Sequence, residues 1–443
     1  MLVFISDLHF TDGTAGPHNI PARAWEYFFE DLVAITQKPS NRITELKLVL
    51  LGDIFDLLRT ETWFKHPEKE RPWGTDEAAI EAHAGLILDQ VIAANDRALA
   101  AIRGQLPTLM ERCNLDEEAR LIYLPGNHDR LVNKYPSLQA KVGAALGPHL
   151  VWPAPGNFFR HSHPDLAYGV FARHGQEYDD LNYEKVGSFE EADYLAVPIG
   201  DPITTELLTR LPYELNLLLE ARGVPQEQRK IIKDHFQQLD NVRPLMAVVP
   251  WLLYQVRQEN DALVRQAIED AIDGVVDRFS ALQFVKDWYR RRGTWDPLDT
   301  AHRVQWVLRL LKLVKLSTLQ ELLELFGKVD VAGVSLKGKL ERAAFQEFKA
   351  IDPRFRYVVY GHHHEPELLP LFTRGAGGSR FYLNTGTWRR VWQQAGHDGS
   401  FSTWKNQTYL IFYRQGERDA AYPVFETWTG NLTTAEKEPG PGT

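Results

Sequence analysis

The chain has 443 residues, of which 44% are hydrophobic and 25% are charged, and its formal net charge is −9. This length exceeds one minimal domain and allows a large buried core, and the composition is ordinary for a soluble globular protein. The negative charge argues against a protein that coats nucleic acid, although it leaves room for a local basic groove. A single cysteine, Cys113, rules out an internal disulfide framework and favours a reducing compartment, so we expect a cytoplasmic protein.

Short apolar runs alternate with amphipathic stretches over the first 180 residues, which is typical of a layered α/β architecture. The apolar run that begins at Met1 is short and has no basic flank, so we predict a strand there and not a signal peptide. The predicted strands are 2–6, 46–51, 121–124, 150–152 and 168–173, and the predicted helices are 22–37 and 77–103.

Strand signals almost disappear between residues 183 and 350. There Ile268, Ile272 and Val275 recur at helical spacing, which indicates one buried helical face, and residues 306–325 carry a second dense apolar pattern. We therefore predict a large all-helical insertion between two strands of the α/β core. Strand signals resume at 357–360, 381–384, 409–413 and 424–428.

These changes of pattern predict four segments. They are a first part of the core at 1–182, a helical cap or substrate-recognition insertion at 183–350, a second part of the core at 351–430, and a flexible tail at 431–443. Within the insertion, residues 303–315 mix basic and apolar side chains, as an interfacial membrane helix does, but the pattern suits a buried helix equally well. Peripheral membrane contact is therefore one of two interpretations of this stretch.

Five polar clusters directly follow apolar runs that we interpret as strands. They read Asp-Leu-His at 7–9, Gly-Asp-Ile-Phe-Asp at 52–56, Gly-Asn-His-Asp at 126–129, His-Gly at 174–175 and Gly-His-His-His at 361–364. Each of the first four clusters alone is more often a turn or a surface histidine, whereas three consecutive histidines are harder to dismiss. Because all five follow strands in order, we expect them to meet at one edge of a sheet and to form a metal site.

The side chains in these clusters have the chemistry that divalent metals need for phosphoester cleavage, namely oxygen and imidazole ligands with a carboxylate able to bridge two ions. Asp7 and His9 are two residues apart after a strand, so both could bind one metal. Asp53 ends the next strand and is the natural bridging carboxylate. The remaining candidate ligands are an amide oxygen and three imidazoles: Asn127, His174, His362 and His364.

On these five blocks the chain resembles the calcineurin-like metallophosphoesterase superfamily, which is marked by Asp-x-His, Gly-Asp-x-x-Asp, Gly-Asn-His-Asp/Glu, a later His and Gly-His-x-His. The resemblance covers residues 1–180 and about 351–430, but not the insertion. It implies a β-sandwich flanked by helices. It also implies a dinuclear phosphoester hydrolase in which a hydroxide that bridges two divalent ions attacks phosphorus. Mn²⁺ is our first expectation for the metals, with Fe, Zn and Mg as alternatives.

The resemblance also assigns roles to the site residues. It implies that the first metal is held by Asp7, His9, Asp53 and His364, and the second by Asp53, Asn127, His174 and His362. It further implies that His128 stabilises the transition state or protonates the leaving oxygen, and that Asp56 orients His128. The chain departs from the family pattern in having Gln176 after His-Gly at 174–175 and in its long insertion, which leaves the choice of substrate open.

Three arginines lie close to these motifs. Arg130 directly follows the Gly-Asn-His-Asp block and is a candidate contact to a substrate phosphate. Arg389 and Arg390 follow the predicted strand at 381–384. A phosphate contact is the alternative for these two, but we predict that they are solvated surface arginines.

The expected partner is a phosphoester substrate, and the pattern indicates no particular oligomeric state. A nuclease of the same superfamily is one alternative, which the acidic balance disfavours. A phospholipid or lipid-linked pyrophosphate hydrolase is another, if tryptophans of the insertion such as Trp251 and Trp288 line an apolar pocket, although they would ordinarily form the core of the insertion. A metal-binding scaffold without catalysis is disfavoured because His128 and Asp56 are both present.

Overall fold

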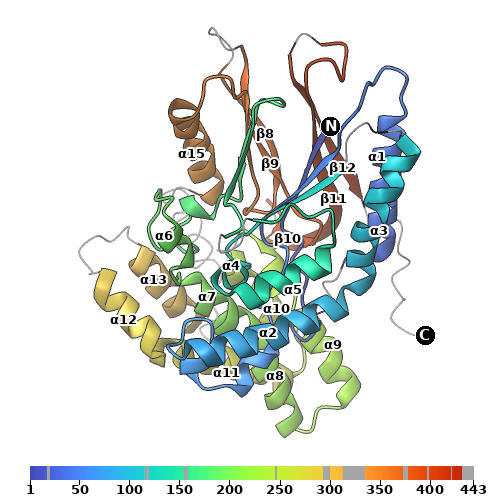
Figure 1. Cartoon of the computed structure of the whole chain (residues 1–443). Helices are drawn as coiled ribbons and strands as arrows, with labels where there is room; N and C mark the ends of the chain where they lie inside the picture. Colours follow the sequence, from blue (N-terminus) through green and yellow to red (C-terminus); the bar gives the residue numbers. More distant parts are fainter. Residues whose placement is uncertain are drawn as a thin grey trace.

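The computed structural model of the chain describes residues 1–16, 20–113, 115, 119–153, 158–244, 247–292, 300–312, 335–372, 378–396, 399–420 and 422–431. Within these residues the protein is mixed α/β, and its strands form two mixed sheets (Figure 1). This confirms the predicted α/β class. The tail is predicted at 431–443, but Asn431 is the last residue of strand β12 (Val424–Asn431). The rest of the predicted tail, 432–443, and the part of the second helical pattern at 313–325 lie outside the described residues.

The first sheet has the strand order β3-β2-β1-β11-β10-β6, and β12 pairs with β11 as well. Strands β1, β2 and β3 are parallel, with Val3 opposite Leu48 and Leu48 opposite Leu121, whereas β11 runs antiparallel to β1. Three carboxyl-terminal strand ends therefore meet at one edge. The strands are β1 Leu2–Ile5, β2 Lys47–Leu51, β3 Arg120–Leu124, β6 Val242–Arg243, β10 Arg390–Gln394, β11 Phe401–Tyr413 and β12 Val424–Asn431.

The second sheet has the strand order β4-β5-β7-β9-β8. Its three central strands, β5, β7 and β9, are parallel, and the edge strands β4 and β8 run antiparallel to them. The strands are β4 Ser162–Asp165, β5 Val170–Arg173, β7 Tyr357–Tyr360, β8 Pro366–Phe372 and β9 Arg380–Thr385.

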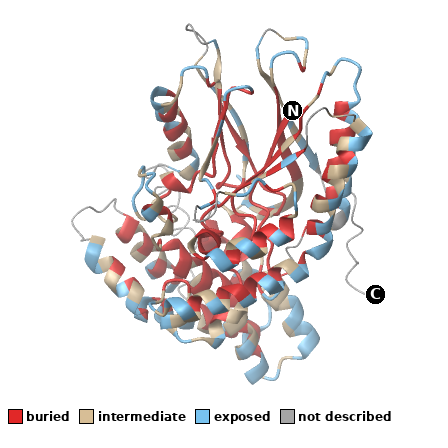
Figure 2. Ribbon diagram, viewed as in Figure 1, coloured by how far each residue is buried: buried red, intermediate tan, exposed pale blue. Residues whose placement is uncertain are grey.

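The two sheets pack face to face and helices cover their outer faces. Phe4 and Val49 from the first sheet share one buried cluster with Val170 and Val359 from the second. Burial is densest along these strands and on the helix faces that meet them (Figure 2). The first sheet is covered by α1 Ala22–Thr36, α2 Glu77–Ala94, α3 Asp96–Cys113 and α5 Pro136–Leu146, and the second by α15 Leu336–Ala350.

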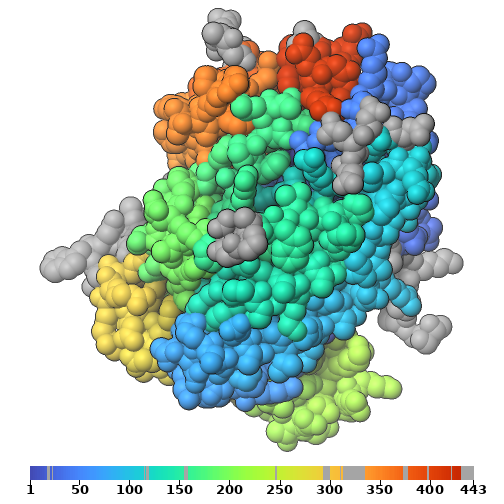
Figure 3. All heavy atoms as spheres, in the orientation of Figure 1, coloured from blue at the N-terminus to red at the C-terminus, as the bar shows by residue number. Residues whose placement is uncertain are grey.

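The helices between residues 191 and 312 build a core of their own, in which Trp251 and Trp288 are fully buried. These two tryptophans therefore lend no support to an apolar substrate pocket. In the space-filling view, the yellow and yellow-green helices of this part occupy the end of the molecule opposite the orange and red strands (Figure 3). The helices are α6 Glu191–Leu195, α7 Gly200–Pro202, α8 Arg210–Ala221, α9 Gln226–Phe236, α10 Val248–Gln258, α11 Ala262–Ala281, α12 Gln283–Arg292 and α13 Thr300–Lys312.

The prediction of an all-helical insertion is wrong at one point. The two-residue strand β6 pairs in parallel with β10, with Val242 opposite Trp392, and joins the helical part to the first sheet. A strand of two residues carries no periodicity, so no sequence pattern marks it. This small strand matters because it brings the residues around Asp240 to the edge where the polar clusters lie.

Two further predictions need correction. The predicted strand at 150–152 is only an isolated bridge between Leu121 and Leu150. The predicted helix at 77–103 is two helices that divide at Asn95, whose Nδ2 donates to the carbonyl oxygens of Thr11 at 2.8 Å and Val91 at 2.7 Å. Among the described residues, no helix combines the length and the apolarity needed to cross a membrane.

Candidate metal centre

The five predicted clusters meet at one edge of the paired sheets. Asp7, Asp53 and Asn127 follow the parallel strands β1, β2 and β3 of the first sheet. His174 and His362 follow β5 and β7, which are parallel neighbours in the second sheet. Because carboxyl ends of parallel strands lie together, residues from distant parts of the chain become neighbours here.

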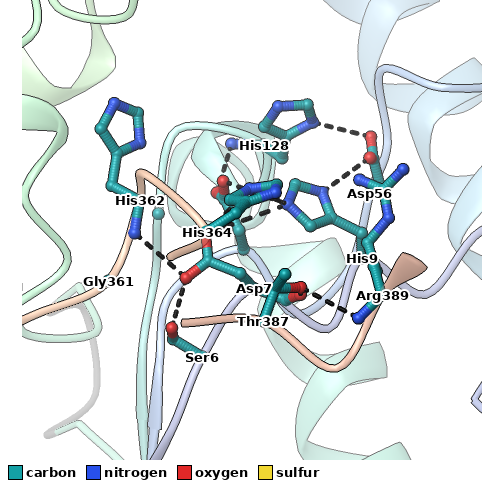
Figure 4. Close-up of polar contacts among 12 residues, drawn as sticks. Ser6, Asp7, His9, Asp56, His128, Gly361, His362, His364, Thr387 and Arg389 are labelled. Carbon is teal, nitrogen blue, oxygen red and sulfur yellow. Dashed lines mark hydrogen bonds and ion pairs between the residues drawn. The ribbon is translucent and has the colours of Figure 1, made fainter. Parts of the chain in front are cut away.

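The first group of side chains consists of Asp7, His9, Asp53 and His364, each with a ligand atom within 4.8 Å of those of the others. His364 Nε2 lies 3.2 Å from Asp7 Oδ1 and 3.2 Å from His9 Nε2. Figure 4 shows these rings and the Asp7 carboxylate turned toward one another. All four side chains are buried. They are the four residues that we predicted for the first metal.

The second group consists of Asp53, His174 and His362, again within 4.8 Å of one another. His174 Nε2 lies 3.3 Å from Asp53 Oδ2. The fourth predicted ligand of this group, Asn127, is also buried at the same sheet edge, and its Oδ1 has no hydrogen-bond partner among the described residues. Asp53 belongs to both groups, which is the position that a bridging carboxylate requires.

Hydrogen bonds on the outer side of two histidines leave one nitrogen of each free to bind a cation. His174 Nδ1 donates to the Leu51 carbonyl oxygen at 2.8 Å, so Nε2 is the nitrogen that can offer a lone pair to a cation. His362 Nε2 lies 3.0 Å from Asp179 Oδ2, which leaves Nδ1 as the lone-pair atom. Both of these lone-pair atoms, together with Asp7 Oδ1, are buried and without a hydrogen-bond partner among the described residues. Since such atoms are costly to leave unpaired, this donor set fits divalent cations.

The backbone is strained at the same positions. Among the described residues, the non-glycine residues with positive φ are all candidate ligands. Strain of this kind costs about 1–3 kcal/mol for each residue and is retained where function requires the geometry. Close packing adds a second constraint, because a Cβ at Gly126 would collide with the Asp53 carboxylate. The strained residues are Asp7 (φ 51°), His9 (φ 46°), Asp53 (φ 53°), His362 (φ 74°) and His364 (φ 68°).

Asp56 joins the candidate ligands to His128. Its Oδ2 lies 2.9 Å from His9 Nδ1 and its Oδ1 lies 2.9 Å from His128 Nδ1 (Figure 4). Burial opposes a charge on His128, but the Asp56 and Asp53 carboxylates outweigh it and raise the pKa of His128 to about 9. Burial likewise opposes ionisation of Asp56, yet His128 and His9 hold its pKa well below the usual range. The pair therefore favours a carboxylate and a protonated imidazole at neutral pH.

Arg389 corrects a sequence prediction. We predicted a solvated arginine, but its exposed fraction is 2%, and its Nη2 lies 3.0 Å from Asp240 Oδ2. Its partner Asp240 lies in the segment before β6, which has no motif in the sequence. Sequence analysis also missed Asp179, whose contact with His362 is described above. The acidic pair Asp179-Asp180 soon after His174 was the one local signal for it.

Arg130, the candidate phosphate contact, is buried and paired. Its Nη2 lies 2.6 Å from Asp201 Oδ2 and donates to the Pro72 carbonyl oxygen at 3.1 Å. It also lines a small hollow together with Asn127 and Tyr194. The Arg130 charge is already paired with the Asp201 carboxylate. Contact between Arg130 and a substrate phosphate stays a prediction.

The variant Arg130→Met is expected to lower the free energy of unfolding by about 3–5 kcal/mol, because it leaves the Asp201 carboxylate buried without its partner. Urea unfolding followed by tryptophan fluorescence measures this. The double variant Arg130→Met with Asp201→Leu is the control, and it should recover most of the loss since no charge is then left unpaired. Unchanged stability together with lost turnover would assign Arg130 to substrate binding instead.

No protein-family model matches the chain, and no curated protein is found to be related to it.

Proposed function

We propose that this protein is a dinuclear metal-dependent phosphoester hydrolase of the calcineurin-like metallophosphoesterase type. The observation that carries the proposal is the convergence of six motif residues at one edge of the paired sheets as two buried groups that share Asp53, with Asn127 buried at the same edge. Unpartnered atoms at Asp7, Asn127, His174 and His362 support it, because each is an oxygen or imidazole nitrogen of the kind that divalent cations bind. Two face-to-face sheets with the site at their strand ends are in keeping with the same fold type.

Two divalent cations, when bound, would supply Lewis acidity and a water of lowered pKa. Asp53 would help to hold both cations, since its carboxylate lies 3.7 Å from His9 Nε2 in the first group and 3.3 Å from His174 Nε2 in the second. His128 would donate its proton to the leaving oxygen. Asp56 would hold the His128 ring in place through the 2.9 Å contact with Nδ1. Burial of these side chains would strengthen each of these charge interactions.

The test is the metal content and turnover of the purified chain. After loading with Mn²⁺ and removal of excess metal, elemental analysis should find two ions per chain. Turnover of p-nitrophenyl phosphate or bis(p-nitrophenyl) phosphate should disappear after chelation and return with Mn²⁺, and Fe²⁺, Zn²⁺ and Mg²⁺ are compared in the same way.

The two chromogenic compounds also divide the possible activities. Faster diester cleavage would favour a phosphodiesterase, and faster monoester cleavage would favour a phosphatase. Turnover that survives complete removal of metal would contradict the proposal. Two bound metals with no turnover of these or other phosphoesters would revive the metal-binding scaffold.

A further inference from the structure

Three arginines gather around one carboxylate beside the candidate metal centre. Arg59 Nε and Arg389 Nη2 each lie 3.0 Å from Asp240 Oδ2. Arg243 Nη1 donates to the Asp240 carbonyl oxygen at 2.7 Å and to the Val242 carbonyl oxygen at 2.9 Å. Arg59 and Arg389 come from the core, whereas Asp240 and Arg243 come from the segment that β6 attaches to the first sheet.

The positive charge of this arginine cluster is not balanced. Its three guanidinium groups gather at Asp240, and the one other carboxylate that the described part of the chain places in ion-pair distance, Asp56, lies 4.0 Å from Arg59 Nη1 and already pairs with His128. Arg59 and Arg389 are each only 2% exposed. Burial and the neighbouring Arg59 charge lower the pKa of Arg389 to about 10, which still leaves it protonated at neutral pH. Arg59 Nη1 and Arg389 Nε and Nη1 have no hydrogen-bond partner among the described residues. Buried donors and excess positive charge of this kind are what an anion needs.

The arginine cluster lies on the side of the centre where His128 lies. Asp56 accepts from His128 through Oδ1, and its Oδ2 is 4.0 Å from Arg59 Nη1. Arg243 Nη2 lies 2.6 Å from Nδ1 of the candidate ligand His364.

We propose that Arg59, Arg243 and Arg389 bind the leaving group of the substrate, and that the preferred substrates are therefore phosphoric anhydrides, whose leaving group is itself a phosphate. The inference rests on the proposed function, in which His128 faces the leaving oxygen. A neutral alcohol leaving group would leave the buried guanidinium donors without a partner, whereas a departing phosphate gives them oxygens to bind. The site therefore selects against substrates whose leaving group is not a phosphate, because these leave buried guanidinium N–H groups unpaired.

The reaction balances with water as the only co-reactant. A water oxygen forms a bond to one phosphorus, and the bond from that phosphorus to the bridging oxygen breaks. The electron pair of the broken bond stays on the bridging oxygen, which leaves as part of the second phosphate. One water proton passes to solvent, and His128 supplies the proton that the leaving oxygen takes up. The products are two phosphate monoesters.

Binding of inorganic phosphate to the metal-free full-length chain tests the arginine cluster without any turnover. Isothermal titration calorimetry should find one phosphate per chain. Arg59→Gln and Arg389→Gln should each weaken binding by about tenfold or more, because each removes a charge-assisted donor. Asp240→Asn should instead tighten binding, because it removes the competing carboxylate. Arg290→Gln on the exposed end of α12 is the matched control for loss of one charge and should change nothing.

A pair of substrates tests the leaving-group assignment in the metal-loaded protein. Two adenosines joined by a diphosphate should be cleaved with a kcat/KM at least about tenfold above that of two adenosines joined by one phosphodiester, and Arg389→Gln should remove the difference. Equal kcat/KM for both compounds, or phosphate binding that none of the three variants changes, would overturn the inference. Turnover of neither compound, with phosphate binding that responds as expected, would contradict the proposed function and support the arginine cluster.

Discussion

Replacing Asp53 with asparagine should lower metal-dependent turnover by about a thousandfold or more and should remove at least one of the two cations. Asp53 Oδ2 lies 3.7 Å from His9 Nε2 and 3.3 Å from His174 Nε2, so this one carboxylate serves both ligand groups. Asparagine has the same size but no charge, and its amide nitrogen does not bind a cation. The loss of turnover should therefore come from weaker cation binding and not from a change in packing.

Asp165→Asn is the matched control, because Asp165 is also buried but pairs with Lys47, which begins β2 at the end opposite Asp53. It should keep two ions per chain and full turnover. Elemental analysis and steady-state kinetics on both variants at saturating Mn²⁺ separate weak metal binding from a damaged reaction. Retained activity in metal-stripped Asp53→Asn protein would reject the metal-dependent mechanism.

The buried parallel strands could be predicted from the sequence, because such strands are short, branched and apolar. Strands β4, β6, β8 and β10 were missed. The strand predicted at 357–360 has the bounds of β7. The failures have physical causes. The apolar run at 150–152 makes only one bridge, and the predicted helix at 77–103 breaks where Asn95 bonds to the backbone of a distant loop. Such long-range contacts override local propensity and leave no periodic signal.

The candidate ligands could be predicted because each sits in a short motif at a strand end. The residues that surround them could not. Asp240 and Arg243 are brought to the centre by a two-residue strand, and there Asp240 pairs with the buried Arg389. A buried arginine and an exposed one look alike in a single sequence. The charge balance beside the centre is therefore a property of the tertiary structure, and substrate preference depends on that balance.

Removing the His128 imidazole should lower kcat by about 10²–10⁴-fold while two cations stay bound. His128 is not among the candidate ligands, and its Nδ1 is held by Asp56, so the proton available to a leaving oxygen is on Nε2. His128→Ala removes both nitrogens. His128→Asn keeps an N–H donor in the place of Nδ1 and removes only the distal one. If proton donation is the role of His128, both variants should lose kcat to a similar extent, with little change in metal content.

Comparing His128→Ala with His128→Asn shows whether His128 donates a proton to the leaving oxygen or only holds Asp56 in position. If Asn restores most of the kcat lost in Ala, His128 acts by holding Asp56, and through it His9, in position. The control is His363→Asn, since His363 is equally buried but pairs with Glu367 at 3.4 Å and lies between two candidate ligands. It should leave kcat and metal content unchanged. A substrate whose leaving group has a low pKa gives a further test, because such a group departs without a proton. If His128 donates a proton, the loss of kcat in His128→Asn should be smaller with this substrate.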